Sequence, residues 1–275
     1  MEFKDQVVII SGSGRGIGAA AAKQFAAQGA KLVINDLNQE PAEQVAAEIV
    51  ESGGEAIAFA GDVTDLDFPE KIIAACIKEY GKLNILVNNA GFTWDAFSHK
   101  MTEEQWQAII AVHITAPFRM IKAAAPYMRG AALQEIETTG TAENRCVINV
   151  SSVSGLHGNM GQANYATAKA GIVGLTKTIA KEWGPIGVRA NTVAFGYIDT
   201  RLSRAKEDGE AISVKGQEVA LGIPEKILQQ LDARVIPLGR AGNVDEAAAG
   251  IVMLASAKAS YITGHTLEVT GGFGI

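Results

Sequence analysis

The chain has 275 residues, of which 48% are hydrophobic, and a net charge of −6 with acidic and basic residues mixed along its length. This length is enough for one large α/β domain or two small ones. The sequence contains no basic segment with interleaved aromatic residues, and no window of about 18 uninterrupted apolar residues. We therefore expect neither a nucleic-acid partner nor a helix that spans a membrane.

The two cysteines, Cys76 and Cys146, are far apart and do not have a spacing typical of metal ligands. This pattern favours two buried thiols in a reducing compartment and predicts no metal site. The N-terminal residues lack the charged-then-apolar pattern of a signal peptide. We expect a soluble, cytoplasmic protein.

Residues 7–10 (VVII) form a short apolar run that predicts a buried strand, and residues 11–18 (SGSGRGIG) form a glycine-rich loop before an alanine-rich helix. Glycines let the backbone approach phosphates, and the helix N-terminus offers unpaired N–H groups. Strand–helix turns also contain glycine for tightness alone. The flanking strand and helix together favour a dinucleotide site.

A second predicted strand, residues 31–36, ends on Asp36. An acid at this position can accept hydrogen bonds from both ribose hydroxyls of an adenosine, and it would repel a 2′-phosphate. Arg15 in the glycine loop has the opposite preference, because it could pair with that phosphate. Alternatively, Asp36 caps the next helix. We predict NAD as the cofactor, with NADP as the alternative.

A third predicted strand, residues 55–60, is followed by Asp62, which either contacts the adenine amino group or serves only as a turn residue. A fourth strand leads into residues 88–91 (NNAG), whose small residues let the backbone pass close to a ligand. Strands and helices alternate throughout, without a linker or repeat. The sequence predicts a Rossmann-type doubly wound parallel sheet of about seven strands with helices on both faces, in a single domain spanning residues 1–275.

The pattern is completed by one long helix and by two segments that do not fit a minimal α/β unit. Residues 102–128 predict a long helix with a broad apolar stripe, suited to packing on the sheet and against a partner subunit. Residues 129–145 are polar, and we expect a surface excursion. Residues 201–234 exceed the usual connection of about 2–6 residues and follow a sixth strand. We expect this segment to be a mobile substrate lid, the alternative being a plain surface insertion.

Three polar residues follow the fifth predicted strand, residues 146–150. Ser152 lies at its carboxyl end, where open α/β sheets place their ligands. Tyr165 and Lys169 are four residues apart and project from the same face of a helix. A neighbouring ammonium favours the phenolate, so we expect the pKa of Tyr165 to lie below its usual value of about 10, which suits proton exchange with a substrate. Most Tyr-x-x-x-Lys pairs are nevertheless solvated helix faces.

These motifs together resemble the short-chain dehydrogenase/reductase family over nearly the whole chain. The matching positions are the glycine motif with Ser11 in place of the usual threonine, the unchanged Asn-Asn-Ala-Gly at 88–91, Ser152, Tyr165 and Lys169, and the final strand and turn at 262–264 and 271–272. The resemblance implies hydride transfer between a secondary alcohol and a nicotinamide cofactor. In it, Tyr165 is the general acid, Lys169 lowers the pKa of Tyr165 and binds the nicotinamide ribose, and Ser152 orients the carbonyl.

The resemblance also assigns the cofactor contacts. They come from the glycine loop, the strand ends and the helix with the Tyr–Lys pair, and comprise Gly12, Arg15, Gly16, Ile17, Gly18, Asp36, Leu37, Asp62, Val63, Asn89, Ala90, Gly91, Tyr165, Lys169, Gly196, Ile198 and Thr200. Phe195 stands where the family usually has proline before this glycine, which changes the wall near the nicotinamide.

Within the family, residues 158–164 resemble both the 3-oxoacyl carrier-protein reductases and the (3R)-hydroxyacyl-CoA dehydrogenase part of peroxisomal multifunctional enzymes. Residues 35–37 and 112–113 favour the second group. His113 stands where the family usually has an asparagine that holds a water in a proton relay. It is either a fourth catalytic residue in such a relay or a structural helix histidine.

The resemblance implies an acyl thioester substrate first, a 3-hydroxyacyl or 3-oxoacyl compound, with steroid, sugar or cyclic alcohols as alternatives. A carrier protein as partner would require a basic patch, for which Arg119, Lys122, Arg129 and Arg201 are candidates. A non-catalytic dinucleotide sensor and a sugar epimerase are rivals from other classes. The family's usual helix pair, here 102–128 and 163–183, implies a homotetramer.

Overall fold

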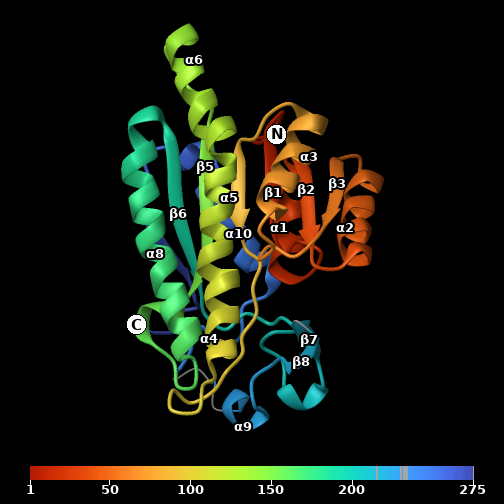
Figure 1. Ribbon diagram of the computed structural model, residues 1–275, viewed down its shortest axis with the longest axis vertical. Coiled ribbons are helices and arrows are strands. Elements are labelled where there is room, and N and C mark those ends of the chain that lie inside the picture. The colour runs from red at the N-terminus through yellow and green to blue at the C-terminus, as the bar shows by residue number, and fades with distance from the viewer. Residues whose placement is uncertain (215, 230, 232–234, 275) are drawn as a thin grey trace.

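The computed structural model describes residues 1–214, 216–229, 231 and 235–274, and its centre is a seven-stranded parallel sheet (Figure 1). The strand order is β3-β2-β1-β4-β5-β6-β9, so the winding direction changes between β1 and β4. The strands are β1 Val7–Ile10, β2 Lys31–Asp36, β3 Glu55–Ala60, β4 Ile85–Asn88, β5 Arg145–Ser152, β6 Val188–Phe195 and β9 Thr266–Val269. The predicted doubly wound sheet is confirmed.

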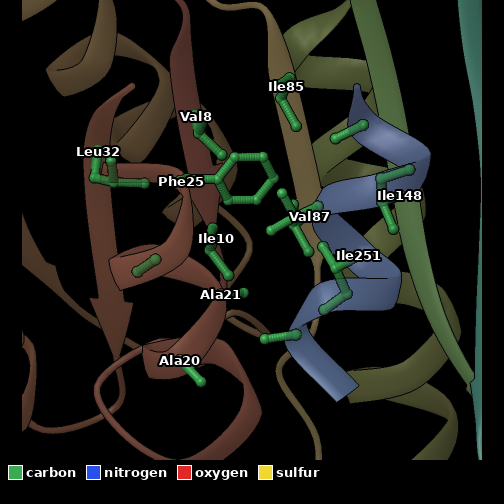
Figure 2. Packing of buried hydrophobic residues seen from close by; sticks show 14 of the residues in the cluster. Val8, Ile10, Ala20, Ala21, Phe25, Leu32, Ile85, Val87, Ile148 and Ile251 are labelled. Atoms are coloured by element: carbon green, nitrogen blue, oxygen red, sulfur yellow. The ribbon is translucent and has the colours of Figure 1, made fainter. Parts of the chain in front are cut away.

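Helices cover both faces of the sheet, because alternate side chains of each strand point to opposite faces. Helices α1, α2 and α10 pack on one face, against residues such as Val8 and Ile10, as Figure 2 shows for α1 and α10. Helices α3, α5 and α8 pack on the other, against residues such as Val7 and Ile9. Their bounds are α1 Gly16–Ala27, α2 Gln39–Glu51, α3 Phe68–Tyr80, α5 Ala116–Ala125, α8 Ala163–Trp183 and α10 Val244–Ala255.

One continuous helical segment runs over residues 103–139, and it corrects the prediction for residues 129–145. It comprises α4 Glu103–Ile110, a π-helical turn Ala111–Thr115, α5, a second π-helical turn Pro126–Gly130 and α6 Ala131–Thr139. The predicted surface excursion is therefore mostly helix, and α6 projects beyond the rest of the fold (Figure 1). The polar composition suggested an excursion, but the π-helical turn accommodates Gly130 and the helix continues through it. The helix stops at Gly140, which has a left-handed conformation with φ of 83°.

By length and composition alone, this 37-residue segment could cross a membrane. Its inner side chains, however, belong to the core between helix and sheet. Met120, Ala124, Met128 and Ala132 are all buried in the same apolar cluster as strands β1 and β4. Packing on the sheet accounts for its apolar composition.

The segment after β6 contains local structure of its own. It forms a 3₁₀ turn Lys206–Asp208, an antiparallel hairpin of β7 Ala211–Val214 and β8 Gln217–Ala220, and a short helix α9 Glu225–Leu228. The Gln217 side chain donates a hydrogen bond of 3.2 Å to Glu104 at the start of α4. The hairpin therefore lies beside the first turn of the long helix. The predicted lid extends over residues 215, 230 and 232–234, which lie outside the described residues.

A buried ion pair fixes α6 to the sheet. The Arg145 side chain at the start of β5 is 1% exposed and makes two hydrogen bonds, of 2.6 and 2.5 Å, to the two carboxylate oxygens of Glu135. The Glu135 carboxylate also accepts a hydrogen bond from the Glu143 N–H, which closes the turn after α6. Arg145 holds the pKa of Glu135 below its usual value of 4.5, against the opposing effect of burial.

We predict that Glu135→Gln lowers the free energy of unfolding by about 2–4 kcal/mol, because it leaves the Arg145 charge buried without a counter-charge. Glu137→Gln, an exposed change on the same helix, should cost no more than about 0.5 kcal/mol. Because the folded pKa of Glu135 is lowered, its contribution is present above about pH 4.5 and is lost as the pH falls. Chemical denaturation at pH 7 and pH 4 measures both effects. An equal loss in the two variants would contradict the role of the pair.

Candidate active site

Ser152, Tyr165 and Lys169 come from adjacent elements at the carboxyl end of β5. Ser152 is the last residue of this strand and the N-cap of the short helix α7 Val153–His157, where its hydroxyl accepts a hydrogen bond from the Ser154 N–H. Tyr165 and Lys169 lie in the first turns of α8, which packs on β5 and β6. The structure brings the three predicted residues together at the sheet edge where open α/β folds bind ligands.

Lys169 is held by the strand beneath it. Its ammonium donates a hydrogen bond of 2.7 Å to the Val150 carbonyl, and the Ser151 hydroxyl donates one of 2.6 Å to the Lys169 carbonyl. Its Nζ lies 5.5 Å from the centre of the Tyr165 ring. Gly155 of α7 passes so close that a Cβ there would lie 2.5 Å from the Lys169 carbonyl carbon. Both the backbone and the side chain of this lysine are therefore fixed.

The glycine loop lies between β1 and α1 and is braced by the loop after β4. Gly12 and Gly16 have positive φ angles of 63° and 54°, which glycine adopts without strain. The Asn89 side chain donates hydrogen bonds of 3.0 and 2.9 Å to the Ser11 and Gly12 carbonyls. A Cβ at Gly12 would lie 2.8 Å from the Ala90 Cα. The two predicted cofactor loops thus contact each other directly.

Asp36 ends β2 beside this loop, and one of its carboxylate oxygens accepts a hydrogen bond of 3.1 Å from the Asn38 N–H. The N-cap of α2 is Asn38, so the alternative of Asp36 as the helix cap is wrong. Asp62 accepts hydrogen bonds of 2.8 and 2.7 Å from the N–H and hydroxyl of Thr64, so it does serve as a turn residue. Its contact with adenine stays a prediction.

The segment after β6 returns to the glycine loop. Gly196 packs against Thr270, because a Cβ at Gly196 would lie 2.9 Å from the Thr270 Cα. Further along, the Thr200 methyl lies 3.9 Å from where a Cβ of Gly16 would be. Ile198, between Gly196 and Thr200 in the sequence, is buried. Leu37, at the other end of the site, is exposed.

The residues present fit a nicotinamide dinucleotide. The N-terminus of α1 supplies unpaired N–H groups at a glycine loop without obstructing side chains, which is how pyrophosphates are bound. An acid stands at the end of β2, and the Ser–Tyr–Lys group stands at the end of β5. Adenosine and nicotinamide halves would therefore lie on either side of the change in winding direction, as in other sheets of this topology.

Comparison with known proteins agrees with this geometry. A family model described as short chain dehydrogenase matches residues 6–211. The chain belongs to this family. Three relatives have the name 3-oxoacyl-(acyl-carrier-protein) reductase. The protein from Thermotoga maritima is 35% identical over 99% of both chains, that from Synechocystis sp. 39% over 97% of this chain and 96% of its own, and that from Vibrio cholerae 37% over 99% and 98%.

The electrostatics of this short-chain dehydrogenase correct one prediction. Burial raises the pKa of Tyr165 to about 12, although a hydrogen bond with Ser152 acts in the opposite direction. Burial also lowers the pKa of Lys169 to about 7. The expectation that Lys169 lowers the pKa of Tyr165 is therefore wrong for the cofactor-free chain. Removal of the phenol from water outweighs its hydrogen bond with Ser152.

His113 lies in the π-helical turn between α4 and α5 and is 4% exposed. Its Nε2 lies 2.8 Å from the Phe92 carbonyl oxygen, which can only accept, so Nε2 bears the proton. Its Nδ1 is buried without a partner in the described part of the chain. The ring stands edge-on to Tyr165 at 5.1 Å, in the space left by Gly91, where a side chain would collide with it. Burial and then Lys169 hold the pKa of His113 well below 6.5.

Sequence reasoning missed the loop that borders Tyr165. Gln162 donates a hydrogen bond of 3.0 Å to Asp95, and the Ala96 N–H donates one of 2.9 Å to the Gly161 carbonyl. The Asn164 side chain donates one of 3.1 Å to the Trp94 carbonyl. Residues 94–96 are thus joined to the residues just before Tyr165. These contacts link distant segments, so no local spacing could have indicated them.

We predict that Lys169→Met stabilises the cofactor-free protein more at low pH than at high pH. The unfolded lysine titrates near 10.5 and the folded one near 7, so the unfolded chain binds the extra proton between these values. The wild-type protein therefore gains stability as the pH rises through this window. The free-energy difference between variant and wild type should fall by about 2–3 kcal/mol from pH 6 to pH 9.

Lys177→Met, an exposed change two turns further along α8, is the matched control and should show no such dependence. Denaturation of the three proteins at the two pH values measures the difference. A constant difference for Lys169→Met would contradict a near-neutral pKa for this lysine.

Proposed function

We propose that this short-chain dehydrogenase interconverts 3-hydroxyacyl and 3-oxoacyl thioesters by hydride transfer with a nicotinamide cofactor. The observation that carries the proposal is the Ser152–Tyr165–Lys169 group at the carboxyl edge of the sheet, in a chain that matches 3-oxoacyl-(acyl-carrier-protein) reductases from end to end. Steroid, sugar and cyclic alcohols are the alternative substrates. A non-catalytic sensor would not require the Tyr–Lys pair, and this chain retains it.

The nicotinamide, when bound, supplies or accepts the hydride. In ketone reduction, Tyr165 gives its phenolic proton to the alkoxide oxygen as that oxygen forms. The raised pKa keeps this phenol protonated at neutral pH, which is the form that an acid catalyst requires. Ser152 lies at the strand end, where its hydroxyl can hold the substrate oxygen, and Lys169 is positioned to bind the nicotinamide ribose. Orientation of reacting groups in this way can contribute about 7–11 kcal/mol.

We further propose NAD as the preferred cofactor, because Asp36 stands where an adenosine ribose is bound and would repel a 2′-phosphate. Arg15, the exposed N-cap of α1, is the residue that would favour NADP instead. The two charges compete for the same ligand group, and Asp36 is the one held in place by a backbone hydrogen bond.

We infer that residues 201–234 act as a substrate lid and that the chain is a cytoplasmic homotetramer without nucleic-acid, membrane or metal partners. The lid is supported by two contacts with the rest of the fold. Thr200, just before the segment, lies beside the glycine loop, and Gln217 of β8 donates a hydrogen bond to Glu104 of α4. Phe118 and Tyr127 on the long helix are exposed apolar residues suited to a subunit contact. Among the candidates for a carrier-protein patch, Arg119 already donates to the Thr64 carbonyl, which leaves Lys122, Arg129 and Arg201 as the better candidates.

We predict that Tyr165→Phe lowers kcat for acetoacetyl-CoA by about 10²–10⁴-fold, because no other group replaces the lost proton donor. The dissociation constant of NADH should be unchanged. Tyr261→Phe, an exposed tyrosine outside the proposed site and the long helix, is the control and should retain full activity. Absorbance at 340 nm follows the reaction, with a steroid ketone and a cyclic ketone as competing substrates. Near-full turnover by Tyr165→Phe would refute the mechanism, and preference for a cyclic ketone would refute the substrate class.

For His113 we propose a positioning role in place of a relay. Its Nε2 proton is committed to the Phe92 carbonyl, and its low pKa disfavours the doubly protonated ring that a relay passes through. The side chain instead ties the π-helical turn to the loop that follows β4 and supports Tyr165.

We predict that His113→Asn retains kcat within about tenfold, because an amide can also donate to the Phe92 carbonyl, whereas His113→Phe loses more, since this carbonyl is then left without its partner. The pH profile of kcat should keep its midpoints in His113→Asn. A profile that moves in this variant would show that the imidazole takes up a proton during turnover and would overturn the positioning role.

A further inference from the structure

Gly14 is a glycine that the backbone does not require. The loop around it uses glycine at positions 12 and 16 for their positive φ angles, whereas Gly14 has no positive φ. A left-handed conformation is therefore not what favours glycine at this position. In the family's Gly-x-x-x-Gly-x-Gly pattern, this position is one of the variable ones. The reason for a glycine must therefore lie in what surrounds it.

What surrounds Gly14 is the carboxylate of Asp36. A Cβ at Gly14 would lie 2.7 Å from Asp36 Oδ2, 2.9 Å from the Asp36 Cβ and 2.9 Å from the Cβ of Pro41. All three distances are shorter than carbon atoms tolerate, and two of them involve atoms close to the backbone, which cannot swing away. Asp36 and the glycine loop are in direct contact only because Gly14 has no side chain.

The Asp36 carboxylate is also held on its other side. Its Oδ1 accepts a hydrogen bond of 3.1 Å from the Asn38 N–H, and the side chain is 9% exposed. Pro41 is buried in the first turn of α2 and cannot retreat. The carboxylate therefore lies in a space bounded by Gly14, Asn38 and Pro41, and its orientation is fixed before any ligand binds.

We propose that Gly14 is a second specificity-determining residue for the cofactor, acting through Asp36. Because Gly14 has no side chain, the Asp36 carboxylate can lie against the glycine loop. There the carboxylate would accept hydrogen bonds from the adenosine ribose and repel a 2′-phosphate. Preorganisation of this kind favours the ligand that needs no rearrangement. The inference rests on the NAD preference proposed above.

The test is the equilibrium binding of NADH and NADPH to the full chain, measured by fluorescence titration. We expect the wild-type protein to bind NADH more tightly. Gly14→Ala should weaken NADH binding about tenfold, the loss of one hydrogen bond to a charged group, with a smaller effect on NADPH. The ratio of the two dissociation constants then shifts toward NADPH. In an Asp36→Ala background, Gly14→Ala should change both constants alike and leave the ratio unaltered.

Two further variants serve as a control for crowding and as a second test of the space beside Asp36. Gly54→Ala introduces similar crowding, 2.8 Å from an Ile49 methyl at a turn that does not touch Asp36, and should leave the ratio unchanged. Asp36→Glu keeps the charge but adds a methylene that the space beside Gly14 does not admit, and should lose NADH preference. The melting temperature of cofactor-free Gly14→Ala shows whether this variant folds. If it does not, Asp36→Glu provides the test.

The outcomes separate the two proposals. Equal weakening of NADH and NADPH by Gly14→Ala in the wild-type background, or full NADH preference in Asp36→Glu, would overturn the role of Gly14. A wild-type protein that binds NADPH more tightly, with no change in Asp36→Ala, would overturn the NAD preference itself. That second result needs no Gly14 variant, so failure of one proposal is distinguishable from failure of the other.

Discussion

The hydrogen bond from the Lys169 ammonium to the Val150 carbonyl is the contact on which the site depends, because it joins the helix of the Tyr–Lys pair to the strand that ends in Ser152. A buried amine needs a hydrogen-bond partner, and the Val150 carbonyl provides it. With the Ser151 hydroxyl on the Lys169 carbonyl, the two contacts set how far α8 lies along β5. The distance between the phenol and the serine follows from that register.

Deeper in the fold, a chain of buried amides and hydroxyls fixes the same helix a second time. Asn88 donates to Asn149, Asn149 donates to Thr176 of α8, and Thr192 of β6 donates to the same threonine, at 2.8, 2.8 and 2.9 Å. Each hydrogen bond joins a different pair of elements, so this series of hydrogen bonds specifies which strands lie beneath α8. An apolar interface alone would permit the helix to slide by small amounts. The polar chain permits one register.

The sheet was predictable because apolar runs and glycine loops are local signals. Tyr165 and Lys169 were predictable because four-residue spacing defines a helix face, and Ser152 because it follows an apolar run at a strand end. The two predictions that were wrong, for α6 and for the pKa of Tyr165, depend on contacts and burial that only the folded structure shows. The sequence did not indicate α6 because the ion pair between Glu135 and Arg145 stabilises this helix, and the burial of Arg145 cannot be read from the sequence. The pKa of Tyr165 was predicted in the wrong direction because spacing indicates which charges are near and says nothing of how much water is excluded.

This exclusion of water gives the site a particular electrostatic state before any ligand arrives. Burial favours a neutral phenol at Tyr165, a neutral amine at Lys169 and an uncharged ring at His113, whereas Asp36 stands at the end of β2, at the other end of the site. A dinucleotide is anionic at its pyrophosphate and polar at its two riboses. Under the proposed function, the glycine loop would bind this anion through N–H groups, and Asp36 would discriminate between cofactors. In the proposed function Lys169 serves both binding and chemistry, because it would bind the nicotinamide ribose and lies beside the phenol that gives the proton.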